Sequence, residues 1–149
     1  MGYTHYFPHK KVSKSVWTDI LAGCKRAYAL LPKNIKITGG SGYGAKPLFG
    51  EDEILFNGDA EEDLAHETFA LYRESGGGFA FCKTAQKPYD VLVVACLLIY
   101  HHFSPSTIEI STDGDKGDWE AGHALAERAL GLPVAYPKIE HWPAENENK

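Results

Sequence analysis

The chain has 149 residues and a formal net charge of −5; 44% of its residues are hydrophobic and 23% are charged. This length fits one domain with a sizeable core, and the composition is typical of a soluble globular protein. Its most basic stretch is Lys10-Lys11 with Lys14, so duplex nucleic acid is an unfavourable partner on electrostatic grounds. A small anion is still a compatible ligand at this net charge, because a pocket needs only a few local cations to bind it.

The cysteines and the hydropathy pattern indicate a cytoplasmic protein. Cys24, Cys82 and Cys96 are odd in number and lack metal-ligand spacing, so we expect free thiols in a reducing compartment. The N-terminal residues lack the cationic and apolar regions of a secretory signal. The longest apolar run, 91–100, is too short to cross a bilayer. We therefore expect no membrane partner and no cofactor.

The first half of the chain predicts short strands around one amphipathic helix. Tyr, Thr and Phe are strand-favouring residues, and they dominate the segment that ends at Pro8. Apolar residues then recur at helical spacing from Trp17 until Pro32 ends the pattern. The expected elements are a strand over 2–7, a helix from Ser13 or Ser15 to Leu31, and short strands over 35–38 and 53–57.

Two apolar segments around a glycine-rich turn predict a β-hairpin. Residues 67–73 and 79–85 flank Glu74–Gly78, and we expect Arg73 to pair with Phe79. One face of this hairpin then carries Phe69, Leu71, Phe79 and Phe81. The opposite, small and polar face carries His66, Thr68, Cys82 and Thr84. A shift of one residue would exchange the two faces.

The second half predicts an apolar helix from Pro88 to His102, a core strand over 107–111 and a helix over 119–130 that Gly131 ends. Residues 132–149 are expected to form a surface tail. The predicted fold is a single α+β domain over 1–149, with a mostly antiparallel sheet of about five or six strands packed against three helices.

The junction between strand 79–85 and the following helix is the strongest indication of a site. Polar side chains between two buried elements need partners, and a ligand can supply them. The loop that follows Ile110 is another position where ligand-contacting residues occur. The ligand-binding candidates are His66, Thr68, Lys83, Thr84, Tyr89, Asp90, Ser111 and Asp113.

Lys83 is predicted to lie at the end of the apolar hairpin face, where a buried ammonium group requires a counter-charge. Asp90, in the first turn of the next helix, is the expected partner, because the helix dipole favours a carboxylate there. The pair is either a structural ion pair or a couple beside a bound ligand. The neighbouring Cys82 points to the opposite strand face and is expected to be a buried, unreactive thiol.

Three local patterns resemble ligand-binding motifs without completing them. The loop Gly39–Gly44 lacks the lysine spacing and the following helix of a phosphate-binding loop, so we expect a connector or a lid. The His-Glu pair at 66–67 lacks the second histidine of a zinc-binding helix, because Ala70 stands there. The acidic loop 113–118 lacks the glycine and the glutamate of a calcium loop. We therefore expect no metal site.

Several motifs together resemble a group of small uncharacterised proteins from phage, bacterial and fungal sequences. They are the start Met1-Gly-Tyr-Thr-His-Tyr6, the block Phe81-Cys-Lys-Thr-Ala85 with Lys87-Pro-Tyr-Asp90, and Asp113-Gly114 followed by Asp118-Trp119. No established activity comes with this resemblance, so it assigns no catalytic residue. It implies a compact intracellular single domain.

The leading functional hypothesis is a domain that binds a small polar, anionic and nucleotide-like ligand at the junction of strand 79–85 and helix 88–102. Tyr3, Tyr6 and Tyr43 are available to stack on a base. The alternative is a small metal-independent hydrolase, lyase or transferase in the same pocket, with His66, Lys83 and Asp113 as catalytic candidates. A third hypothesis is an interaction or inhibitor module, which requires an exposed apolar patch. A homo-oligomer is compatible with all three.

Overall fold

The computed structural model describes residues 2–143. In chain order its strands and helices are β1 (Thr4–Tyr6), α1 (Lys14–Leu30), β2 (Leu48–Phe49), β3 (Glu53–Phe56), β4 (Phe69–Tyr72), β5 (Phe81–Lys83), α2 (Asp90–Phe103), β6 (Ser111–Thr112) and α3 (Glu120–Leu130). Short 3₁₀ helices cover Ala60–Glu62, Pro105–Thr107 and Lys116–Trp119. The fold is α+β with three helices, as predicted. Strands β1, β3, β4 and β5 and helix α1 begin and end close to the expected residues. The expected strand 107–111 is displaced to β6, β2 was not expected, and 35–38 is reduced to one bridge between Thr38 and Asn57.

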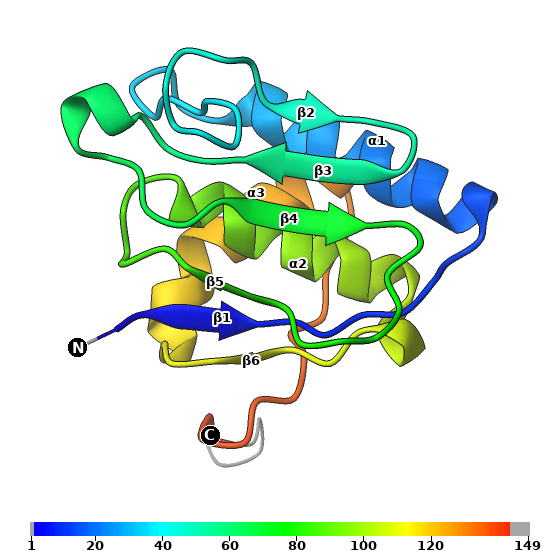
Figure 1. The fold of residues 1–149 in the computed structure, drawn as a ribbon. Helices are drawn as coiled ribbons and strands as arrows, with labels where there is room; N and C mark the ends of the chain where they lie inside the picture. Colours follow the sequence, from blue (N-terminus) through cyan, green and yellow to red (C-terminus); the bar gives the residue numbers. More distant parts are fainter. Residues whose placement is uncertain (1, 144–149) are drawn as a thin grey trace.

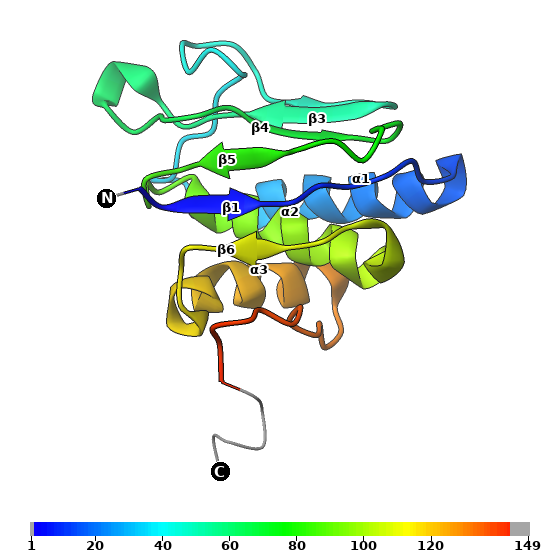
Figure 2. The same cartoon turned by 60° about the horizontal axis from the view of Figure 1, so that its bottom comes forward.

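The strands form one layer, and all three helices lie on one side of it (Figure 1). Hydrogen bonds divide the layer into two antiparallel three-stranded sheets, β2-β3-β4 and β5-β1-β6. Figure 2 shows β5, β1 and β6 in succession. The expectation of a single sheet with about five or six strands is therefore wrong.

The predicted hairpin fails because β5 pairs with β1 and β4 pairs with β3. At the boundary between the sheets, the Glu67 side chain accepts the Lys83 amide at 2.7 Å, and the Glu67 amide donates to the Lys83 carbonyl at 3.1 Å. The Glu67 side chain thus takes the place of the backbone hydrogen bonds that would join β4 to β5. The predicted apolar face is divided as well: Phe69 and Leu71 are fully buried, whereas Phe79 and Phe81 are 76% and 44% exposed.

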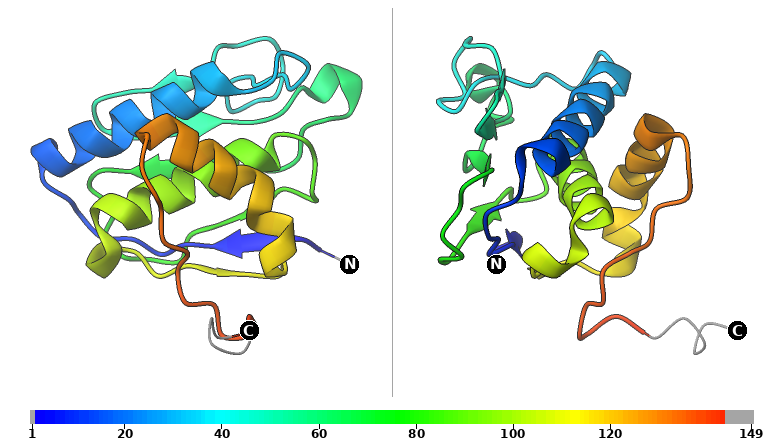
Figure 3. Two further views of the ribbon diagram at one scale, coloured as in Figure 1. Left: turned by 180° about the vertical axis from the view of Figure 1, so that it is seen from behind. Right: turned by 90° about the vertical axis from the view of Figure 1, so that its right-hand side faces the viewer.

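Helix α2 forms the centre of the core. Every residue from Leu92 to Tyr100 is at most 1% exposed, because the strand layer covers one side of α2 and the other helices cover the rest (Figure 3). Two glycines allow close helix crossings: a Cβ at Gly23 would lie 2.8 Å from Ile99 Cγ2, and one at Gly122 would lie 2.4 Å from Val94 Cγ1. The core therefore depends on small residues where α1 and α3 cross α2.

The helix ends follow the expected signals. Ser13 caps α1 by accepting the Val16 amide at 3.2 Å, and α3 ends at Gly131 in the left-handed conformation with φ of 69°. Beyond it, Val134 and Ile139 pack into the core, so this part of the predicted tail is anchored. Residues 144–149 of the tail lie outside the described residues. Within 2–143, no helix has the combination of length and apolar character that a membrane crossing requires.

His9 connects the two sheets and should make stability pH-dependent. Its Nδ1 atom lies 2.8 Å from the Phe7 carbonyl, and its Nε2 atom accepts the Tyr72 amide at 3.1 Å. The carbonyl can only accept, so Nδ1 carries the proton and Nε2 must stay unprotonated. Burial lowers the pKa of His9, and the smaller opposing effect of the Phe7 carbonyl does not cancel this shift.

As the pH falls, the unfolded chain therefore binds the His9 proton before the folded chain does. The stabilising contribution is complete above a pH of about 6.5 and is lost as the pH falls through the lowered folded-state pKa. We expect His9→Leu to reduce the free energy of unfolding more at pH 7 than at pH 5, measured by urea denaturation against wild type. An equal reduction at both pH values would contradict this role.

Candidate functional site

The inner side of the predicted junction is a closed hydrogen-bond network centred on His5. His5 Nε2 lies 2.6 Å from Asp90 Oδ1, and the Thr84 hydroxyl donates to the same oxygen at 2.7 Å. On the other side of the ring, His5 Nδ1 lies 2.8 Å from Thr112 Oγ1, which accepts the Gly114 amide at 3.0 Å. The threonine O–H is thus free to donate to Nδ1, and Nε2–H donates to Asp90. His5 and Thr84 are fully buried.

The expected Lys83–Asp90 pair is wrong. Side chains alternate along β5, so the inward position belongs to the buried Cys82, and Lys83 points outward with Phe81. Lys83 is half-buried and its aliphatic chain runs beside Gly2, where a Cβ would lie 3.4 Å from Lys83 Cε. Asp90 instead forms its hydrogen bonds with His5 and Thr84.

Aromatic rings enclose the His5 network. Tyr3 and Trp119 meet the imidazole edge to face, with ring centroids 5.1 and 5.3 Å from it. The Tyr3 hydroxyl and the Trp119 Nε1 atom are buried without a hydrogen-bond partner among the described residues. Burial raises the pKa of Tyr3, and nearby carboxylates raise it further; these belong to Asp90, Asp118, Asp113 and Asp115. Tyr3 therefore stays protonated, and the network is a largely buried element in which His5 and Thr84 are fully enclosed.

The eight predicted ligand residues divide between the two faces of the strand layer. Thr84, Tyr89 and Asp90 are buried on the inner face. Lys83 is half-buried on the outer face, and His66, Thr68, Ser111 and Asp113 are exposed. The Tyr89 hydroxyl donates to the Glu67 carbonyl at 2.6 Å. One strand–helix pocket containing all eight residues is thus not formed.

The three catalytic candidates do not converge through their side chains. His66 Nδ1 lies 2.8 Å from the Lys83 carbonyl, and Asp113 Oδ2 accepts the Thr4 amide at 3.1 Å. Within residues 2–143, no hydrogen bond or ion pair joins the side chains of His66, Lys83 and Asp113. The geometry needed for the enzyme alternative is therefore not formed by these contacts.

The outer face carries an aromatic cluster that includes Phe79 and Phe81, which were predicted on the apolar face of the hairpin. Tyr6 and Phe79 have ring centroids 6.3 Å apart, and Phe79 and Phe81 have centroids 4.9 Å apart. Tyr6 is the Cα partner of Phe81, and Lys83 follows Phe81 on the same side of β5. All helices lie on the opposite side of the strands (Figure 3). We call Tyr6, Phe79, Phe81 and Lys83 the aromatic face.

His5 and Thr112 are the main residues that the sequence analysis missed. Strand 2–7 was predicted, and the alternation of side chains in a strand would have directed His5 to the same side as Phe7 and hence inward. A buried histidine requires polar partners. The sequence does not, however, reveal that β6 and β5 flank β1 and supply those partners.

The buried position of Cys82 gives a direct test of this arrangement. Burial raises the pKa of the Cys82 thiol to about 12, although a hydrogen bond with Tyr89 partly opposes this shift. Cys24 and Cys96 are also fully buried. At pH 8 we expect no reaction of the native protein with Ellman's reagent, and release of all three thiols after unfolding in urea. Rapid labelling of a native thiol would contradict the assigned burial.

Comparison with models of known protein families, with curated proteins and with solved structures gave no match to this chain.

Proposed function

We propose that the chain binds a small, planar and anionic ligand of the nucleotide class on the aromatic face. The observation that carries this proposal is a lysine on the same side of the strand as a cluster of three rings, of which Phe79 and Phe81 are exposed and Tyr6 is half-buried. Successive residues on one side of a strand are about 6.6 Å apart, so Lys83 is one such step from Phe81. A base stacked on the rings would place its anionic group within reach of the ammonium.

The charge and exposure of the aromatic face suit such a ligand. Within residues 2–143, Lys83 forms no ion pair, so its ammonium is free to interact with a phosphate. Exposed aromatic rings stack on any base, because every base has a π-face. Ser111, the other Cα partner of Tyr6, adds an exposed hydroxyl group at the border of the same surface. The selectivity is thus expected to favour an aromatic ring combined with a negative charge.

The test is titration with nucleoside monophosphates and cyclic nucleotides, followed by NMR chemical shifts. Phe81→Ser should weaken binding by about tenfold or more, since stacking contributes about 1–3 kcal/mol per base. Lys83→Gln should weaken phosphate-bearing ligands and leave the corresponding nucleosides unchanged. Tyr72→Ser is the matched control, because Tyr72 is similarly exposed at 42% but belongs to β4. Absence of binding by every nucleotide, or equal binding by all variants, would contradict the proposal.

A protein partner is the second candidate function, and the high exposure of Phe79 favours it. Solvent-facing aromatic clusters are common in protein interfaces, and a second copy of the chain is the simplest partner to test. If the face mediates self-association, light scattering coupled to size exclusion should show a dimer that Phe79→Ser converts to monomer. A wild-type monomer at all concentrations would exclude a homo-oligomer through this face.

A further inference from the structure

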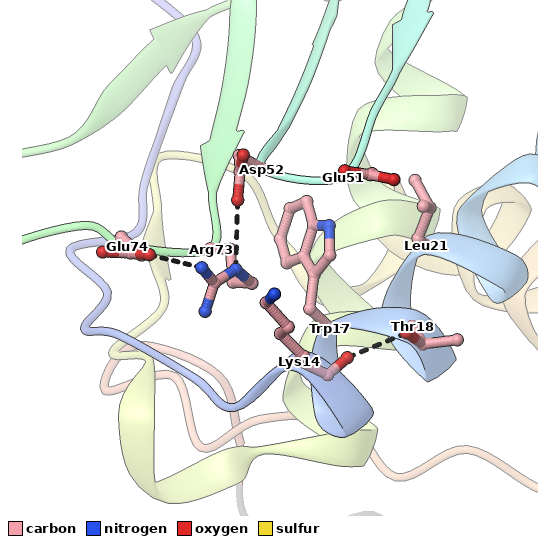
Figure 4. A pocket seen from close by; sticks show the side chains of 8 residues that line it. All are labelled: Lys14, Trp17, Thr18, Leu21, Glu51, Asp52, Arg73 and Glu74. Atoms are coloured by element: carbon pink, nitrogen blue, oxygen red, sulfur yellow. Dashed lines mark hydrogen bonds and ion pairs between the residues drawn. The ribbon is translucent and has the colours of Figure 1, made fainter.

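A separate pocket of about 550 Å³ lies where the start of α1 meets the β2–β3 turn and the end of β4 (Figure 4). Helix α1 contributes one stripe of side chains at helical spacing, and the other two segments contribute charged groups. The lining residues are Lys14, Trp17, Thr18, Leu21, Glu51, Asp52, Arg73 and Glu74. None of them belongs to the aromatic face.

Arg73 is part of the wall of this pocket and is not available to a ligand. Its Nε atom donates to Asp52 Oδ1 at 3.1 Å, its Nη2 group pairs with Glu74, and Nη1 donates to the Val12 carbonyl at 3.4 Å. The Arg73 residue is only 8% exposed. The guanidinium therefore holds the two carboxylates and the start of α1 in place, and it leaves a net negative charge around itself.

Two opposite charges in the pocket have no ion-pair partner among the described residues. Within residues 2–143, neither Lys14 nor Glu51 forms an ion pair. The Trp17 ring stands between them in Figure 4, and Leu21 adds apolar surface on the Glu51 side. The indole N–H donates to the Gly50 carbonyl at 3.0 Å, which fixes the ring. Among the described residues, the pocket thus has a cation and a carboxylate without ion pairs, and an apolar wall formed by Leu21 and the small exposed part of Trp17, which is 2% exposed.

We infer that this pocket binds a short zwitterion whose ammonium and carboxylate groups flank an apolar segment, the class that includes dipeptides of apolar residues. The ligand carboxylate pairs with Lys14 and the ligand ammonium pairs with Glu51. The apolar part packs on Leu21 and on the exposed edge of Trp17. The lining carries two cations and three carboxylates, a net charge of −1, so it disfavours a purely anionic ligand. A purely cationic ligand would leave Lys14 without a counter-charge. The volume falls in the range of small-molecule sites, about 300–1,000 Å³.

The experiment is titration of the full chain with Leu-Leu, observed through the indole N–H signals in NMR spectra. The Trp17 signal, assigned with Trp17→Phe, should shift in a saturable way, whereas those of Trp119 and Trp142 should not. N-acetyl-Leu-Leu lacks the ammonium group and Leu-Leu amide lacks the carboxylate, so both should bind up to about fivefold more weakly, the effect of one exposed ion pair.

Exchanging the charges of Lys14 and Glu51 distinguishes specific binding in this pocket from non-specific binding to the protein surface. Lys14→Glu and Glu51→Lys should each weaken Leu-Leu binding by about tenfold, because each loses an attraction and gains a repulsion. The double variant Lys14→Glu/Glu51→Lys should recover affinity, since the zwitterion can bind in the reversed orientation. Lys25→Gln and Glu61→Gln, exposed residues outside the pocket, should leave binding unchanged. No Trp17 shift in the wild type, or no recovery in the double variant, would overturn the inference.

Discussion

Alanine in place of Asp90 is expected to lower the free energy of unfolding by about 3–5 kcal/mol. The Asp90 carboxylate receives hydrogen bonds from His5 and Thr84, and both donors are fully buried. Removing the carboxylate leaves two buried donors without a partner, and each costs about 1–3 kcal/mol. Urea denaturation followed by far-UV circular dichroism would measure the loss.

The matched comparison is Lys83→Met, which removes the charge that the sequence analysis assigned to the same pair. Lys83 is outward-facing and makes no contact with Asp90 among the described residues, so its replacement should change stability by at most about 0.5 kcal/mol. A His5→Ala variant should resemble Asp90→Ala, and the double variant should cost less than the sum of the two. Equal destabilisation by Lys83→Met and Asp90→Ala would refute the network as we describe it.

Valine in place of Gly122 should produce the second large effect, about 3 kcal/mol or more of lost stability. A Cβ at this position would lie 2.4 Å from Val94 Cγ1 and 3.0 Å from the Val91 carbonyl oxygen. Relief requires α3 to move away from α2, because neither a β-branched side chain nor the backbone of a fully buried helix can shift freely. Thermal unfolding followed by circular dichroism would register the change.

Two further variants separate overpacking at Gly122 from other effects of the mutation. Gly117→Ala is the control, since a Cβ there meets no heavy atom within 4 Å, and we expect a change within about 0.5 kcal/mol. Combining Gly122→Ala with Val94→Ala should restore part of the stability that Gly122→Ala loses, because the two methyl groups compete for the same space. If Gly122→Val were as stable as wild type, the close α2–α3 crossing would be wrong.

The helices could be predicted from the sequence because their signals are local. Ser13, Pro32 and Gly131 delimit α1 and α3 by backbone chemistry that depends on a few neighbours, and the apolar run of α2 is unmistakable. Strand pairing is a different problem, because strands of two to four residues carry too little pattern to select a partner. The hairpin prediction treated proximity along the chain as evidence of pairing, and the structure places β1 beside β5 instead.

In the candidate site, too, local relations could be predicted from the sequence and long-range contacts could not. Thr84 and Asp90, both predicted site residues, belong to one network, although the predicted partner of Asp90 was Lys83. Its central residue, His5, comes from the other end of the chain, and no spacing rule connects positions 5, 90 and 112. The aromatic face was missed for a related reason: Phe79 and Phe81 were assigned to the core by hydrophobicity, and only the orientation of β5 turns them to solvent.

The enclosure of α2 has a consequence for how the chain opens. The backbone amides from Leu92 to Tyr100 cannot meet water while the strands, α1 and α3 remain docked around α2, and removing any one of these layers exposes a continuous apolar helix surface. We therefore expect the α2 amides to exchange their hydrogens only through global unfolding. They should be among the slowest-exchanging amides of the protein. Exchange measured at increasing denaturant should show the α2, α1 and α3 amides merging into one class, while the loop 39–44 exchanges independently.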